Sequence, residues 1–122
     1  GANSEPLNVL QAAALKQAQF TAAIRDAGGY ETFTTFYADL TVSERFGPQS
    51  VRETYGRIIQ EWRGDYKYYT EFVLCLNWKI WEHHRKNETL ALLYDELWRE
   101  ADKWAGENLT GEAAAYYYNV TD

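Results

Sequence analysis

The residues best suited to metal chemistry in this chain are Glu82, His83 and His84, which are consecutive. Adjacent positions on a helix point about 100° apart, whereas a helical His pair that binds one metal has a spacing of three or four. No Glu-x-x-His sequence of the kind found in carboxylate-bridged metal bundles supplies further ligands. We therefore expect both histidines to face water near a helix end, where positive charge complements the helix dipole.

The other candidates for catalysis have simpler explanations. Asp95, Glu96, Glu100 and Asp102 form carboxylate pairs on a helical face rich in other charges. A solvated face of this kind does not shift pKa values as acid–base catalysis requires. Cys75 stands between two leucines and is predicted to be a small buried hydrophobic residue rather than a nucleophile. We predict no catalytic, metal-binding or cofactor-binding residue, and expect a protein that is not an enzyme.

Aromatic residues are unusually abundant, with five Trp, ten Tyr and five Phe. Many lie in the carboxyl-terminal half, where one helix stripe cannot bury every ring, and Tyr and Trp are enriched where proteins meet. We therefore predict a surface for a protein partner or a second copy of the chain on the last two helices, made by these residues: Trp98, Glu100, Asp102, Trp104, Tyr116 and Tyr117. The alternative is that a small helical protein uses large side chains to fill its core.

The net charge of −6 is unevenly distributed along the chain. Residues 1–87 contain ten acidic and ten basic residues, whereas residues 88–122 contain eight acidic residues against Arg99 and Lys103. Because contacts to phosphates require Lys and Arg, we expect no direct binding to nucleic acid. A continuous acidic band would instead imitate nucleic acid.

The helices follow from caps and apolar periodicity. Thr41 with Glu44, and Ser50 with Glu53, have the spacing of capping boxes, so each pair predicts a fresh helix start. Asp65 is the expected N-cap of the following helix. The predicted helices cover residues 5–27, 31–40, 51–63, 65–86, 88–106 and 111–118.

The helix predicted over residues 65–86 is apolar on most of its sides, with Phe72, Leu76 and Ile80 on one face and Leu74 and Trp78 on others. A helix of this kind is usually central to its domain. We predict that residues 1–122 form an all-α, single-domain bundle of about five to six helices around this aromatic-rich central helix, since 122 residues suit one domain.

The cellular location is suggested by three features. The longest strongly apolar run, residues 72–76, is far below the roughly 20 residues that cross a bilayer. The amino terminus lacks the pattern of a secretory signal. A single cysteine fits a reducing compartment. We expect a soluble cytoplasmic protein that does not associate with membranes.

Four strings within residues 30–122 resemble a group of uncharacterised small helical proteins from mobile, conjugative genetic elements of gut Firmicutes. They are TFTTFYADL at residues 32–40, NWKIWEHH at 77–84, LYDELW at 93–98 and ENLTGE at 107–112. The resemblance implies a bacterial cytoplasmic accessory protein, and it transfers no active-site residue.

Three function hypotheses follow from these patterns. The first is a non-enzymatic protein-interaction or accessory module of a mobile genetic element, which binds another protein or itself through the aromatic surface. The second is an acidic decoy of the anti-restriction type that imitates nucleic acid. The third is a small enzyme with an unmarked cleft, which we rank last because no sequence motif supports it.

Overall fold

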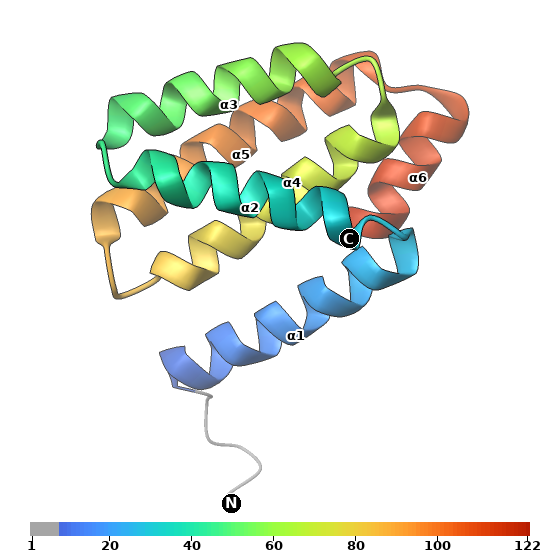
Figure 1. Cartoon of the computed structure of the whole chain (residues 1–122). Helices are drawn as coiled ribbons and strands as arrows, with labels where there is room; N and C mark the ends of the chain where they lie inside the picture. The colour runs from blue at the N-terminus through green and yellow to red at the C-terminus, as the bar shows by residue number, and fades with distance from the viewer. Residues whose placement is uncertain (1–7) are drawn as a thin grey trace, which may run out of the picture.

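The computed structural model describes residues 8–122, and over this range the chain is a compact bundle of six helices without a strand (Figure 1). The predicted all-α fold is therefore confirmed. The helices are α1 Val9–Ala27, α2 Tyr30–Glu44, α3 Pro48–Trp62, α4 Tyr66–His83, α5 Glu88–Asn108 and α6 Gly111–Thr121. None of these helices is both long enough and apolar enough to span a bilayer.

Helix α4 is the centre of the bundle, as its sequence predicts. It contacts each of the other five helices, and in Figure 1 it crosses the middle of the molecule between α2 and α5. Its middle turns are almost completely buried, from Tyr69 to Leu76, and Cys75 lies among them as a packed side chain. The ring of Phe72 meets Phe36 of α2 edge-on at 5.1 Å and lies 5.9 Å from the ring of Tyr55 of α3. Aromatic side chains from three helices thus meet on α4 and form the core.

The predicted starts at the two capping boxes are wrong. Helix α2 continues through Thr41 to Glu44 without interruption, because Leu40 and Ser43 extend its buried face. The hydroxyl of Thr41 accepts a hydrogen bond from Lys79 instead of capping a helix. Helix α3 begins at Pro48, before the predicted start, since proline at the first helical position needs no partner for a backbone N–H.

The other helix boundaries differ more modestly. The predicted start of the first helix at residue 5 lies outside the described residues, and α1 begins at Val9 behind a capping box formed by Asn8 and Gln11. Asp65 caps α4 as predicted. Helix α4 ends at His83, three residues before the predicted end, because Arg85 takes a left-handed conformation with φ of 78°. Helices α5 and α6 run two and three residues further than predicted.

Candidate functional site

The carboxyl end of α4 carries the densest group of polar side chains beneath the surface of the bundle. Lys79, Glu82 and His83 are spaced by three and four residues, so they share one side of α4, and there they meet α2 and α5. We call these three residues, together with Glu44 of α2 and Tyr94 of α5, the Lys79 cluster. All five members carry a titratable group, and salt bridges and hydrogen bonds link them.

Lys79 is the centre of this cluster and its side chain is fully buried. The ammonium nitrogen Nζ lies 3.1 Å from Glu44 Oε2 and 3.0 Å from Glu82 Oε2, and it donates a hydrogen bond of 2.6 Å to Thr41 Oγ1. It also lies 4.1 Å from the centroid of the Tyr37 ring, where a cation is attracted by the π-electrons. All the donors of this buried ammonium therefore point at acceptors or an aromatic face.

Glu44 is the acceptor that joins the three helices. Its Oε2 atom contacts the ammonium of Lys79, lies 2.9 Å from His83 Nε2, and accepts a hydrogen bond of 2.8 Å from the Tyr94 hydroxyl. Burial alone would raise the pKa of Glu44, but hydrogen bonds from His83 and Tyr94 and the charge of Lys79 together lower it. The Tyr94 hydroxyl has a raised pKa, first because it is buried and then because it faces Glu44. Glu44 is thus held as a carboxylate.

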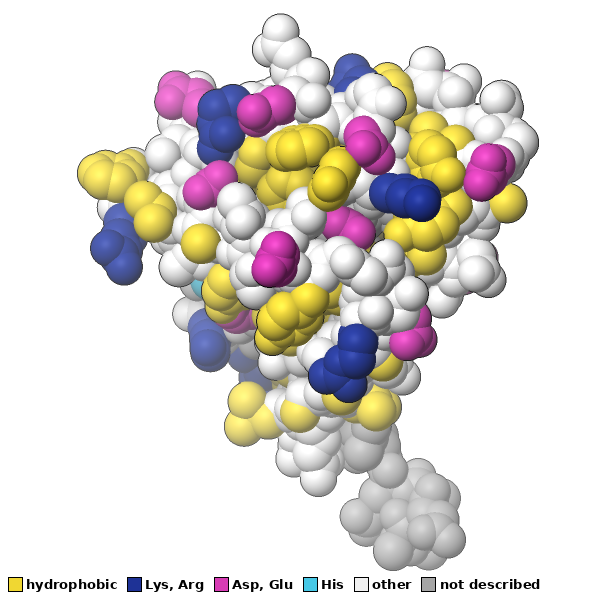
Figure 2. All heavy atoms as spheres, turned by 45° about the vertical axis from the view of Figure 1, so that its right-hand side comes forward, with side chains coloured by type: hydrophobic (Ala, Val, Ile, Leu, Met, Phe, Trp, Pro, Cys, Tyr) yellow, Lys and Arg dark blue, Asp and Glu magenta, His cyan; other side chains and the backbone are white. Residues whose placement is uncertain are grey.

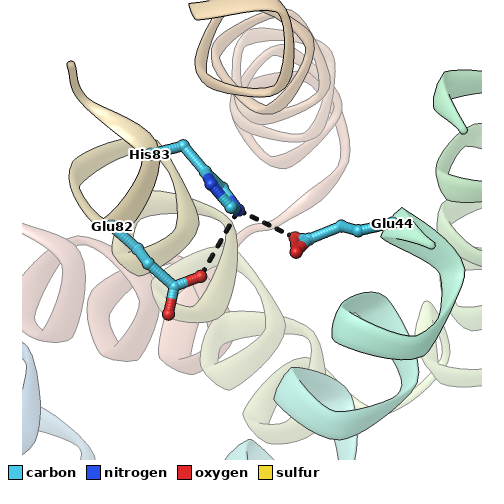
Figure 3. A group of neighbouring side chains, drawn as sticks. All are labelled: Glu44, Glu82 and His83. Carbon is cyan, nitrogen blue, oxygen red and sulfur yellow. Dashed lines mark hydrogen bonds and ion pairs between the residues drawn. The ribbon is translucent and has the colours of Figure 1, made fainter. Parts of the chain in front are cut away.

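The cluster contains a set of side chains that could hold a metal ion. Figure 3 shows Glu82 and His83 of α4 pointing toward Glu44 of α2, and their ligand atoms all lie within 4.8 Å of one another. Yet Glu44 Oε2 and Glu82 Oε2 are the same oxygens that hold the ammonium of Lys79. The position of a bound cation is thus taken by the protein's own lysine, and the arrangement is a buried ion-pair network.

The expectation that both histidines face water is wrong for His83. Its side chain is only 12% exposed and stacks against the Tyr94 ring at an interplanar angle of 2°, whereas His84 is exposed. The spacing rule considered only ligands on one helix. Glu44 lies 39 positions away and reaches His83 through the packing of α2 on α4, which no local pattern in the sequence reveals.

The outward side of the same end of α4 carries two open, largely apolar hollows. The first, of about 460 Å³, lies between α4 and α5, with Ile80, Ala91 and Leu92 among its lining residues. The second, of about 390 Å³, lies between α4 and the first half of α1 and includes Leu10 and Trp81. His84 and Arg85 line both hollows and separate them. We call the surface around the first hollow the α4–α5 face; it consists of Ile80, His84, Arg85, Glu88, Ala91, Leu92 and Asp95.

Leu92 is the apolar residue of this face that sequence reasoning missed. Its side chain is 63% exposed, although it lies in a helix whose other leucines are buried. The stripe of Leu90, Leu93 and Leu97 leaves Leu92 on the opposite side of α5. An apolar residue outside a clear stripe is the signal that could have identified it.

The aromatic residues predicted as a partner surface are mostly used in packing. Trp104 lies 4.9 Å from the Tyr69 ring, with the Arg63 guanidinium 4.7 Å from its own ring. Tyr117 is fully buried and donates a hydrogen bond of 2.8 Å to Asp102.

Of the other predicted partner residues, Trp98 and Tyr116 are half-buried and Glu100 is exposed. Figure 2 brings the α6 side of the molecule forward and shows apolar side chains in separate patches among charges of both signs. The structure therefore does not bring the six predicted residues together in one apolar surface.

A second buried carboxylate lies near the opposite end of α4. Glu71 is 3% exposed and its carboxyl group packs directly on Gly29, in the turn between α1 and α2. Its Oε2 atom has no hydrogen-bond partner among residues 8–122. Burial, and then the negative charge of Asp65, raise the pKa of Glu71 to about 7.

Comparisons of the chain with protein-family models, curated proteins and solved structures give no match.

Proposed function

We propose that this protein is a non-enzymatic interaction module that binds another protein chain through the α4–α5 face. The observation that carries the proposal is that two apolar hollows lie on either side of His84 and Arg85, with Leu92 exposed beside one and Leu10, 74% exposed, beside the other. Exposed apolar side chains beside a hollow and bordered by charged groups are typical of surfaces that bind proteins.

The Lys79 cluster supports this proposal because Lys79 and His83 are the sequence neighbours of Ile80 and His84, two residues of the face. Lys79 and His83 tie the last turn of α4 to Glu44 of α2, and Tyr94 ties α5 to the same carboxylate. The turn that carries His84 and Arg85 is therefore anchored on both sides. A surface that is already ordered loses less conformational entropy when it binds a partner.

The acidic decoy receives less support from the placement of its carboxylates. Glu96 pairs with Arg52 of α3 at 2.6 Å, and Asp95 pairs with Arg99 at 2.8 Å. Asp102 is hydrogen-bonded to Tyr117 of α6. Glu96 thus faces α3 while Asp102 faces α6, so these carboxylates divide over two sides of α5. A phosphate-like band requires one continuous row of free negative charges.

The enzyme hypothesis also receives less support than the interaction module. The side chains that could do acid–base chemistry are already paired with one another and with Thr41, and the hollows outside the cluster are open.

We propose an accessory role for a mobile genetic element, in the reducing cytoplasm. The four strings that resemble small proteins of such elements support this role.

Capture of binding proteins from a lysate of a gut Firmicute tests the proposal. Immobilised wild-type protein is compared with Leu92→Glu, and with Leu15→Glu as a matched control at a half-exposed leucine of α1 outside the face. Circular dichroism first establishes that both variants fold. We expect specific proteins to be retained by the wild type and by Leu15→Glu, and lost with Leu92→Glu. Retention of the same proteins by all three would contradict the proposal.

A further inference from the structure

We infer that the chain which binds the α4–α5 face is a second copy of this protein, related to the first by a twofold axis. This inference rests on the proposed function, because it assigns an occupant to the same surface.

A row of three exposed residues and the half-buried Asp95 along α5 forms the centre of the inferred interface. Glu88, Leu92, Asp95 and Arg99 are spaced by four, three and four positions, so they lie along one side of the helix. Leu92 is 63% exposed, and the side chain of Arg99 is 70% exposed. The row therefore offers an apolar side chain next to a hollow, with an acidic residue on each side and a basic residue at one end.

This row is complementary to itself when two α5 helices pack antiparallel. If the twofold axis passes midway between Leu92 and Asp95, residues equally distant from that midpoint face one another. Glu88 of one copy then faces Arg99 of the other. Leu92 of one copy lies over the hollow beside Asp95 of the other, where Ile80 and Ala91 provide apolar contacts.

The charges of the face favour a second copy over a partner of a single charge sign. Its acidic residues are Glu88 and Asp95, and Arg85 and His84 line the same hollow. A strongly acidic or strongly basic partner would meet a like charge on half of this surface, which is unfavourable. A twofold arrangement reduces this conflict, because it brings Glu88 of each copy toward Arg99 of the other.

The paired state of Arg99 in a single chain is compatible with this arrangement. Arg99 Nε lies 2.8 Å from Asp95 Oδ2, an exposed ion pair between residues four apart. Such pairs contribute little, so Arg99 loses little when it turns toward a second carboxylate across an interface. Its five N–H donors also allow it to contact both carboxylates at once.

Sedimentation velocity at increasing protein concentration and low salt tests the inference. We expect the wild type to convert from the mass of one chain to that of two. Leu92→Glu should raise the dissociation constant of the dimer roughly tenfold or more, as expected when a central apolar contact is lost. Glu88→Arg and Arg99→Glu should each raise this dissociation constant about threefold. The double variant should restore the wild-type value, because position 88 of one copy and position 99 of the other again carry opposite charges.

Two controls make each outcome decisive. Leu15→Glu and Glu53→Arg carry the same changes at exposed positions of α1 and α3, and should dimerise as the wild type does. A wild type that stays monomeric at every concentration overturns the inferred dimer, while the proposed function is still judged by the lysate capture. A dimer that withstands Leu92→Glu, or that the charge swap does not restore, also overturns the inferred interface.

Discussion

A carboxylate is enclosed between α4 and the α2 region near each end of α4, but the two carboxylates have opposite surroundings. At the carboxyl end, Glu44 of α2 contacts Lys79, His83 and Tyr94, and its pKa is lowered. At the amino end, Glu71 of α4 packs on Gly29 with one oxygen unpartnered, and its pKa is raised to about 7. Burial raises the pKa at both places, so the partners decide the sign of the net shift.

This difference indicates which end of the bundle is the more firmly fixed at neutral pH. The carboxyl end joins three helices through charges that satisfy one another, and the α4–α5 face includes Ile80 and His84 from the same end of α4. The amino end holds a carboxyl group that ionises near neutral pH at a cost to folding. We therefore assign the binding surface to the carboxyl end, where the backbone beneath it is held best.

Replacement of Lys79 by Met is the largest expected disruption of the carboxyl end. It removes the ammonium and leaves Glu44 and Glu82 as largely enclosed carboxylates in need of another counter-charge. Removal of one partner from a buried ion pair costs about 3–5 kcal/mol, and we expect a loss of this size in the free energy of unfolding at pH 7. Urea denaturation measures it.

A zinc titration sharpens the same prediction. Zn²⁺ should not raise the melting temperature of the wild type, because the ammonium of Lys79 holds the two oxygens that the ion would need. For the Lys79→Met variant itself, a decrease of less than about 1 kcal/mol in the free energy of unfolding would contradict our interpretation. The cluster would then contribute no more to stability than an exposed ion pair does.

At the amino end, Glu71→Gln should increase the free energy of unfolding at high pH, whereas Lys79→Met decreases it at the carboxyl end. Because the pKa of folded Glu71 is raised, its contribution to stability is complete below pH 4.5 and is lost as pH rises through 7. A shift from 4.5 to about 7 corresponds to about 3 kcal/mol between pH 4 and pH 8.

Urea denaturation across this pH range tests the Glu71 prediction. The variant should lack the wild type's decline in stability, and it should be the more stable protein at pH 8. A decline that persists unchanged in the variant would show that another group is responsible.

Gly29→Ala tests how tightly Glu71 is enclosed. A Cβ atom at this position would collide with the carboxyl group of Glu71, so we expect a loss of about 2 kcal/mol, in the range for overpacked sites. The penalty should shrink when Glu71 is also replaced by Ala. Gly56→Ala is the control: an added Cβ meets nothing within 4 Å there, and alanine in an α3 interior position should stabilise the helix. If Gly29→Ala lowers the free energy of unfolding equally in the wild type and in Glu71→Ala, then Glu71 does not enclose Gly29.

Tyr94→Phe is the mildest change at the carboxyl end. It removes one hydrogen bond of 2.8 Å to Glu44 and keeps the ring that stacks on His83. We expect a loss of about 1.5 kcal/mol, as for a hydrogen bond to a charged group. Nuclear magnetic resonance should show the pKa of Glu44 rising toward its ordinary value, because one of the contacts that lower it is gone. An unchanged titration of Glu44 would contradict the role given to this hydroxyl.

The fold was largely predictable from the sequence because helical periodicity is a local property. The stripe of α5 and the nearly all-round apolar character of α4 identified the bundle and its centre. The capping-box pattern at Thr41 and Glu44 failed because tertiary contacts use both residues: Thr41 accepts from Lys79, and Glu44 joins three helices. A local pattern cannot reveal this competition.

The candidate site was much less predictable, because it depends on contacts between distant parts of the chain. The Lys79 cluster joins residues 35 or more positions apart, and Lys79 itself resembles any other helical lysine in the sequence. The aromatic surplus was visible, but whether Trp104 and Tyr117 pack or remain exposed depends on how α5 and α6 fold back on α4. Leu92 was missed, although its position outside the stripe of α5 is a signal that the sequence does contain.

A dilution series followed by amide nuclear magnetic resonance tests the central assignment most directly. With increasing protein concentration, the amide signals of residues 84–99 should shift, while those around Glu71 and Tyr117 stay constant, because only the carboxyl end of α4 carries the proposed binding face. Shifts concentrated around Glu71 or on α6, with residues 84–99 unchanged, would contradict the account and move the binding surface to the other end of the molecule.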